Sequence, residues 1–180
     1  MGELAMSFLI SSQRNQERDA LSELYYVITD VLDYKTTPIK SRVPGLSLLT
    51  LRDEEIHPFT VISKVRQYID ENGPLIACLR ITPLEQLFKT DISQIAKNAY
   101  ELVQKKVSTE NTWGIVLRKR QTNLRSKEVI LAVADKITWG IVKLNDPDYE
   151  IRIEIIRNLS GISVMPPKTE IKTSDYLKRF

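Results

Sequence analysis

In the first half of the chain, short apolar runs typical of strands alternate with the apolar spacing typical of amphipathic helices. The apolar run at 7–11 predicts a strand, and apolar residues from Glu17 to Leu32 recur at the spacing of an amphipathic helix. The same reasoning predicts a strand, a helix and a strand at 40–51, 58–72 and 75–82. This order is typical of a ferredoxin-like domain, in which a layer of helices covers one face of a sheet.

The second half has its own helix and strand patterns. Asp91 is expected to cap a helix that runs to about Val107, because Gln94 stands in the third position behind it. A strand at 112–121 follows, and then a helix capped by Ser126. The last predicted elements are a strand, a tight turn and a strand within 141–156, and a final strand at 161–165.

The charge balance changes near Asp91. Residues 1–90 hold 10 Lys and Arg against 12 Asp and Glu, whereas residues 91–180 hold 16 against 11. We therefore predict a ferredoxin-like domain at 1–90, a second α/β domain at 91–167 and a tail at 168–180, an α+β protein overall. A basic half is a hint of contact with nucleic acid.

The composition is that of an ordinary globular protein, with 42% apolar and 27% charged residues and a net charge of +3. No apolar run approaches the roughly 18 residues that cross a bilayer. The opening residues lack the basic segment and cleavage site of a signal peptide. We expect a cytoplasmic protein with no membrane partner.

Five cations without an intervening acid stand at the end of the predicted strand at 112–121 and in the segment after it. They are Arg118, Lys119, Arg120, Arg125 and Lys127. On composition alone, such a run is more often a solvated face than a binding site. Strand alternation places Arg118 and Arg120 on one face and Lys119 on the other.

The second half resembles the THUMP domain. The resemblance is carried by a basic strand end, a helix, and the segment VKLNDPDYEIRIEII, in which the matching residues are Val142, Leu144, Pro147, Asp148, Ile151, Ile153, Glu154 and Ile155. The three isoleucines are expected in the core, and Asp146-Pro147-Asp148 is expected to make a tight hairpin turn.

The resemblance changes the interpretation of the five cations. THUMP domains are tRNA-binding modules that hold the acceptor stem and the 3′ end, so the resemblance implies that these cations contact tRNA. Guanidinium groups suit this role because they bond phosphate oxygens with two parallel donors and stack on unpaired bases.

The first half resembles the adaptor proteins of tRNA acetyltransferases, which combine a ferredoxin-like domain with a THUMP domain. Arg80, Ile81, Pro83 and Glu85 within LRITPLEQ carry this resemblance, together with the order of the domains. It implies a partner enzyme that forms N4-acetylcytidine in tRNA. Since little follows Pro167, we expect no catalytic domain here.

Candidate catalytic residues are few. His57 is the one histidine and is expected to cap a helix, and Cys78 is the one cysteine and is expected in the core. Neither a zinc site nor a nucleophile–base pair is expected from them. No glycine-rich phosphate loop is present. We therefore expect a non-catalytic protein with no metal and no cofactor, in which Trp113 and Trp139 serve packing or, less often, base stacking.

Three functions remain open on the sequence. The first is a tRNA-binding accessory to a separate acetyltransferase. The second is the RNA-binding subunit of a split tRNA thiolation or methylation enzyme. The third is a protein-interaction module whose basic strand is only a solvated face.

Overall fold

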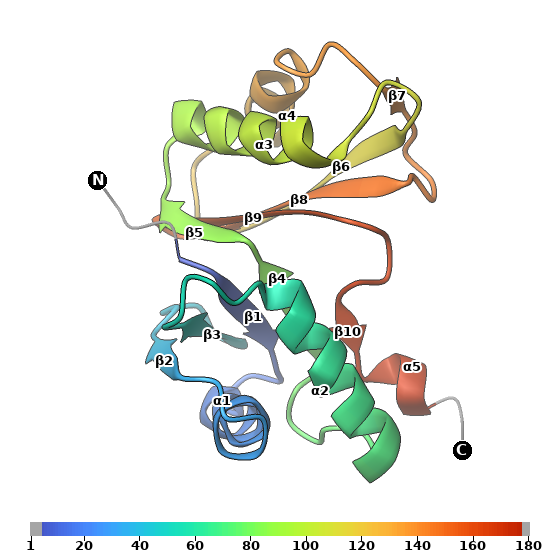
Figure 1. The fold of residues 1–180 in the computed structure, drawn as a ribbon. Helices are drawn as coiled ribbons and strands as arrows, with labels where there is room; N and C mark the ends of the chain where they lie inside the picture. The colour runs from blue at the N-terminus through green and yellow to red at the C-terminus, as the bar shows by residue number, and fades with distance from the viewer. Residues whose placement is uncertain (1–4, 178–180) are drawn as a thin grey trace. The chain divides into compact units, whose positions relative to one another are not determined.

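The computed structural model describes residues 5–177, which form two compact units (Figure 1). Among the described residues, the first unit consists of 5–84 and 168–177, and the second consists of 85–167. Each has its own sheet and its own apolar core. The prediction of an α+β protein is confirmed.

The first unit is ferredoxin-like. Its elements are β1 (Ser7–Ser11), α1 (Glu17–Tyr25), the π-helix η1 (Tyr26–Val31), β2 (Thr36–Ile39), β3 (Leu46–Leu51), α2 (Pro58–Asn72), β4 (Arg80–Leu84), β10 (Ile171–Lys172) and α5 (Ser174–Leu177). The strands form an antiparallel sheet in the order β10-β4-β1-β3-β2. Up to β4 this is the β-α-β-β-α-β arrangement of the ferredoxin-like fold.

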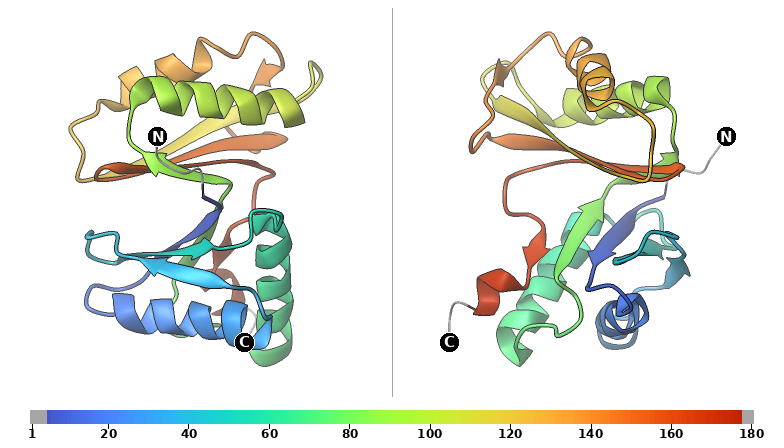
Figure 2. Two further views of the ribbon diagram at one scale, coloured as in Figure 1. Left: turned by 60° about the vertical axis from the view of Figure 1, so that its left-hand side comes forward. Right: turned by 180° about the vertical axis from the view of Figure 1, so that it is seen from behind.

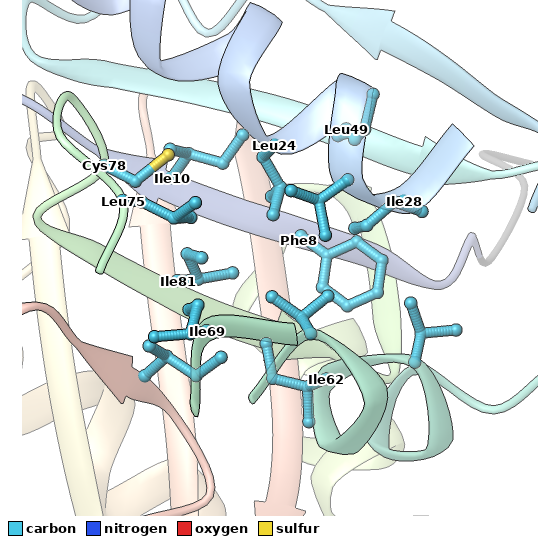
Figure 3. Close-up of a cluster of buried hydrophobic side chains, with 14 of the residues drawn as sticks. Phe8, Ile10, Leu24, Ile28, Leu49, Ile62, Ile69, Leu75, Cys78 and Ile81 are labelled. Carbon is cyan, nitrogen blue, oxygen red and sulfur yellow. The ribbon is translucent and has the colours of Figure 1, made fainter. Parts of the chain in front are cut away.

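The core of the first unit lies between the sheet and its two long helices. Phe8 and Ile10 of β1 point toward Leu24 of α1 and Ile62 of α2, and all four are buried (Figure 3). Both helices therefore cover the same face of the sheet, as the apolar periodicities predicted.

His57 and Cys78 have the structural roles that the sequence predicted. His57 is the N-cap of α2, and its Nδ1 accepts a hydrogen bond from the Phe59 amide at 3.2 Å. Cys78 is fully buried in the core, where its Sγ donates to the Ala20 carbonyl at 3.1 Å. Burial, with a further contribution from Glu23, raises the pKa of the Cys78 thiol far above its usual range.

The second unit is a mixed sheet covered by two helices. Its elements are β5 (Gln86–Lys89), α3 (Ile92–Lys106), β6 (Thr112–Arg120), α4 (Ser126–Ala134), β7 (Ile141–Val142), β8 (Tyr149–Ile156) and β9 (Leu159–Met165). The strand order is β5-β9-β8-β6-β7, and β6 runs parallel to both of its neighbours. Both helices lie on one side of the sheet (Figures 1 and 2).

The apolar core of the second unit follows the predicted alternation. Ile151, Ile153 and Ile155 of β8 are fully buried against α3 and α4. Asp91 caps α3, since its carboxylate accepts a hydrogen bond from the Gln94 amide at 2.8 Å. None of the helices described within residues 5–177 is both long and apolar enough to cross a bilayer.

The division of the chain differs from the predicted 1–90, 91–167 and 168–180. The strand β5 belongs to the second unit because it pairs with β9 and places Phe88 in that core. Residues 168–177, predicted as a tail, return to the first unit, where Ile171 of β10 pairs with β4 and is buried. Residues 1–4 and 178–180 of the predicted domains lie outside the described residues.

Two local predictions were wrong. The strands β7 and β8 do not form a hairpin, because each pairs in parallel with β6 on opposite sides of it. Ser126 is the first residue of α4 rather than its cap, and the N-cap residue Arg125 makes no capping bond through its side chain. A shift of one residue at a helix end is common, because terminal turns are irregular.

Candidate nucleic-acid interface

The strand β6 ends in the basic cluster that the sequence singled out. Trp113, Ile115 and Leu117 pack toward the helices, so the alternation turns Arg118 and Arg120 to the opposite face of the sheet. Both arginines are partly exposed, with 29% and 28% of their side-chain surface accessible. The end of β6 therefore carries two guanidinium groups on the sheet face that points away from the helices.

A buried carboxylate holds these two arginines. Glu154 lies opposite Arg118 on the neighbouring strand β8, and its side chain is fully buried. One oxygen accepts a hydrogen bond from Arg120, and the other lies 3.8 Å from an Arg118 nitrogen. Pairing with this carboxylate restricts the orientation of both guanidinium groups.

A third arginine completes the cluster. Arg152, two residues before Glu154 on the same face of β8, is 4% exposed and lies 3.4 Å from the Glu154 carboxylate. Arg152 also pairs with Glu150 at 3.1 Å. Three arginines against two glutamates leave the cluster with a net positive charge. We name these five residues, Arg118, Arg120, Arg152, Glu150 and Glu154, the arginine cluster.

The sequence predicted only part of the arginine cluster, namely Arg118 and Arg120. Arg152 and Glu154 alternate with core isoleucines, which predicts an exposed polar face, yet both are buried. The alternation of Glu150, Arg152 and Glu154 opposite a basic strand was the available signal. The contact itself could be assigned only once the register of β6 against β8 was known, because that register places Arg118 opposite Glu154.

The remaining predicted cations are separate from Arg118 and Arg120: Lys119 lies on the other face of β6, and Arg125 and Lys127 stand at the start of α4. Lys119 is exposed, and its ammonium donates to the Leu124 carbonyl at 2.8 Å, which ties the end of β6 to the loop before the helix. Arg125 and Lys127 are exposed, and their side chains make no hydrogen bond or ion pair with residues 5–177. The first turn of α4 also carries Glu128, which offsets part of this charge.

The Asp146-Pro147-Asp148 turn fastens the other end of β6. The Asp148 carboxylate accepts a hydrogen bond from the Thr112 amide at 2.8 Å, and the Asp148 amide donates to the Thr112 hydroxyl at 2.8 Å. The bond from the Thr112 amide is the main reason that the pKa of Asp148 is lowered. Asp146 adopts a positive φ of 50°, which aspartate tolerates better than most residues.

The two tryptophans serve packing. Trp113 is 3% exposed and its indole donates to the Trp139 carbonyl at 3.0 Å. The Trp139 indole donates to the Val107 carbonyl at 2.7 Å, and its ring meets Tyr100 edge to face at 5.7 Å. Gly140 has a φ of +75°, and a Cβ there would lie 2.8 Å from the Trp113 ring, so this turn requires glycine.

No metal site is apparent in the part of the chain that the structure describes. Among residues 5–177, no three His, Cys, Asp or Glu side chains are grouped so that they could hold a metal ion.

Comparison with protein families identifies the second unit. The family model of the THUMP domain matches residues 89–165. This range contains all five cations and the whole arginine cluster. The chain therefore contains a THUMP domain. Among curated proteins, none matches the chain's sequence at a significant level.

Solved structures share the fold at low sequence identity. The protein PH1313 of Pyrococcus horikoshii is 16% identical, with a TM-score of 0.65 over 93% of this chain and 55% of its own. TrmN of Thermus thermophilus is 11% identical, with a TM-score of 0.59 over 88% and 45%. A 4-thiouridine synthetase, solved in complex with RNA and ATP, is 15% identical, with a TM-score of 0.58 over 94% and 42%. The chain thus spans about half the length of these proteins.

Proposed function

From the THUMP domain at residues 89–165, we propose that the chain is a non-catalytic tRNA-binding accessory protein. It presents tRNA to a separate acetyltransferase that forms N4-acetylcytidine. The observation that carries the proposal is the basic end of β6, where a net positive arginine cluster lies within a domain of a tRNA-binding type.

The proposed interface has two parts with different roles. Arg118 and Arg120, oriented by Glu154, supply fixed guanidinium groups for phosphates of the acceptor stem and the 3′ end. Lys119, on the opposite face of β6, and Arg125 and Lys127, at the start of α4, supply further charge near the same end of the strand. Phosphate contacts fix the position of an RNA without reading its sequence, so these residues are expected to orient the tRNA rather than to select one.

The proposal assigns no chemistry to this chain. Its one histidine caps α2, and its one cysteine is buried with a raised thiol pKa. Both are thereby committed to the fold. The contribution to modification is positional: tRNA held in a fixed orientation reacts with the partner's catalytic site as if at a high local concentration.

An alternative is that the chain is the RNA-binding subunit of a split thiolation or methylation enzyme. The similarity in fold to a 4-thiouridine synthetase solved with RNA and ATP favours it. In that case, another chain supplies the catalytic domain. The acceptor-stem contact is the same in both proposals, and only the partner differs.

One reconstitution separates these possibilities. The purified chain is incubated with tRNA and acetyl-coenzyme A, ATP or S-adenosylmethionine, alone and with enzymes that co-purify from the source organism. Nucleosides are then analysed by mass spectrometry. We expect no modification by the chain alone and N4-acetylcytidine only when an acetyltransferase is added.

Other results of this reconstitution overturn the proposal in distinct ways. Modification by the chain alone contradicts a non-catalytic role. Stimulation of a thiolation or methylation enzyme supports the alternative. Absence of tRNA binding at low salt leaves only the protein-interaction module.

A further inference from the structure

A pocket in the ferredoxin-like unit combines an apolar lining with cations at its edge. It has a volume of about 610 Å³ and lies between the start of α1 and the connection from β2 to β3. Leu21, Ile39 and Val43 contribute to the apolar lining. This volume is within the range of about 300–1,000 Å³ that is usual for small-ligand pockets.

Three cations line the same pocket. Arg18, Lys40 and Arg42 are all exposed, and their side chains have no hydrogen bond or ion pair with any residue from 5 to 177. One acid, Glu17, also lines the pocket. Its carboxylate accepts a 2.6 Å hydrogen bond from the Gly45 amide, and this bond is the main reason that the pKa of Glu17 is lowered. The pocket therefore keeps a positive surplus in the half of the chain that is acidic overall.

The loop that carries two of these cations is held in one conformation. The Ser41 hydroxyl donates to the Leu46 carbonyl at 2.6 Å and accepts from the Val43 amide at 3.1 Å. Arg42 has a φ of +57°, a region that arginine rarely adopts. The bonds on either side impose this conformation, so Lys40 and Arg42 start from fixed backbone positions.

We propose that this pocket binds an unpaired nucleotide of the RNA held by the THUMP domain. An apolar lining accepts the flat face of a base, and the cations at the edge accept the flanking phosphates. Arginine is suited to both tasks because its guanidinium group stacks on bases and bonds phosphate. The inference rests on the proposed tRNA binding and adds a second site of binding, on the other unit.

The test replaces the two loop cations without disturbing the loop. The variant is Lys40→Gln with Arg42→Asn, because asparagine tolerates the positive φ at position 42. The matched control is Lys35→Gln with Arg52→Gln, which removes the same charge from exposed positions of the same unit. Affinity for tRNA and for a labelled single-stranded RNA hexamer is measured over a range of salt concentrations.

We expect the loop variant to weaken binding of both RNAs. The log–log salt slope should fall by about 0.7 for each single-strand phosphate that the variant no longer binds. The control should change affinity by less than roughly twofold, since charges far from a bound phosphate are screened. Crosslinking of 4-thiouridine-labelled RNA should yield a modified peptide from residues 38–46.

A second arm identifies the source of the nucleotide. AMP is added as a competitor of the RNA hexamer. AMP at a concentration near the Kd of the hexamer should not displace the hexamer, because a lone nucleotide lacks the flanking phosphates and bases. Tight binding of AMP that RNA does not displace overturns the proposal in favour of a free nucleotide.

The remaining outcomes separate this inference from the proposed function. If Arg125→Ala with Lys127→Ala weakens tRNA binding while the loop variant behaves like its control, the pocket proposal fails and tRNA binding stands. If the unaltered protein binds no tRNA at low salt, the proposed function fails and the pocket proposal falls with it.

Discussion

The two basic surfaces of the molecule are built in opposite ways. In the arginine cluster, the fully buried Glu154 holds Arg118, Arg120 and Arg152. At the pocket, Arg18, Lys40 and Arg42 are bonded to no acid among residues 5–177, and the one nearby carboxylate bonds to a backbone amide. The charges of the arginine cluster form ion pairs with one another, and the cations at the pocket are exposed to solvent.

The charges of the arginine cluster therefore contribute to the stability of the fold, whereas those at the pocket do not. A buried carboxylate is tolerated only when cations compensate it, so a change in the arginine cluster is expected to affect folding as well as the proposed tRNA binding. Exposed cations without partners contribute little to folding, so they can be altered for binding alone. Variants of the arginine cluster are therefore expected to lose more stability than variants of exposed, unpaired charges.

Glu154→Ala is expected to cause the largest loss of stability. It removes the carboxylate that joins three arginines on one sheet face, so the buried Arg152 loses an acidic partner and depends more on Glu150. Breaking a buried ion pair on one side costs about 3–5 kcal/mol. Urea denaturation measures the loss. Glu110→Ala, at an exposed turn position, should stay within about 0.5 kcal/mol of the original protein. Equal stability of both variants would remove the distinction between the two surfaces.

Arg120→Ala is expected to lower both stability and tRNA affinity. Glu154 keeps Arg118 and Arg152 as partners, so the free energy of unfolding should fall by less, about 1–3 kcal/mol. Denaturation and tRNA binding are measured on the same preparation. A loss of affinity with unchanged stability would show that the Arg120–Glu154 pair does not hold the sheet.

These two predictions rest on contacts that the sequence predicted only in part. Local periodicity was enough for the helices α2 and α3 and for the buried isoleucines of β8, since each pattern reports its own element. The cations of β6 were likewise visible as a run. Their acidic partner was not visible. Arg118 and Glu154 are 36 positions apart in the chain, and only the register of β6 against β8 brings them together.

The errors have the same physical origin. The strand β2 was missed because it has four residues and contains Pro38, which is tolerated at the sheet edge. A hairpin was predicted from the Asp-Pro-Asp turn, yet β6 lies between the two strands that flank this turn. The predicted tail returned to the first sheet through a strand of only two residues. Short elements are decided by tertiary pairing rather than by their own sequence.

Arg125→Ala with Lys127→Ala is expected to affect binding alone. Both side chains are exposed and unbonded within the described chain, so unfolding should change by no more than about 0.5 kcal/mol. The log–log salt slope of tRNA binding should fall by about 0.9 for each duplex phosphate that the variant no longer binds. Lys97→Ala with Lys105→Ala, on exposed positions of α3, removes the same charge and serves as the control. The same slope in both variants would place the tRNA elsewhere.

The smallest effect is expected from Asp148→Asn, which tests a charge that is exposed but bonded to the backbone. The Thr112 amide lowers the pKa of Asp148 below its ordinary value of 3.8. A carboxyl group whose pKa is depressed on folding stabilises the fold above its unfolded-state pKa. This contribution is lost as the pH falls through the lower folded-state pKa. Asparagine keeps an oxygen for the Thr112 amide but carries no charge, so it lacks the pH-dependent part.

The melting temperatures of the original protein and of Asp148→Asn should therefore differ most near neutral pH. The difference should shrink as the pH is lowered from about 4 toward 2, because protonation removes the charge from Asp148 as well. Thermal denaturation at closely spaced pH values measures this change. A difference that stays constant over the whole range would mean that the turn depends on the shape of the side chain and not on its charge. In that case, the dependence of stability on charge in this unit would be confined to the arginine cluster.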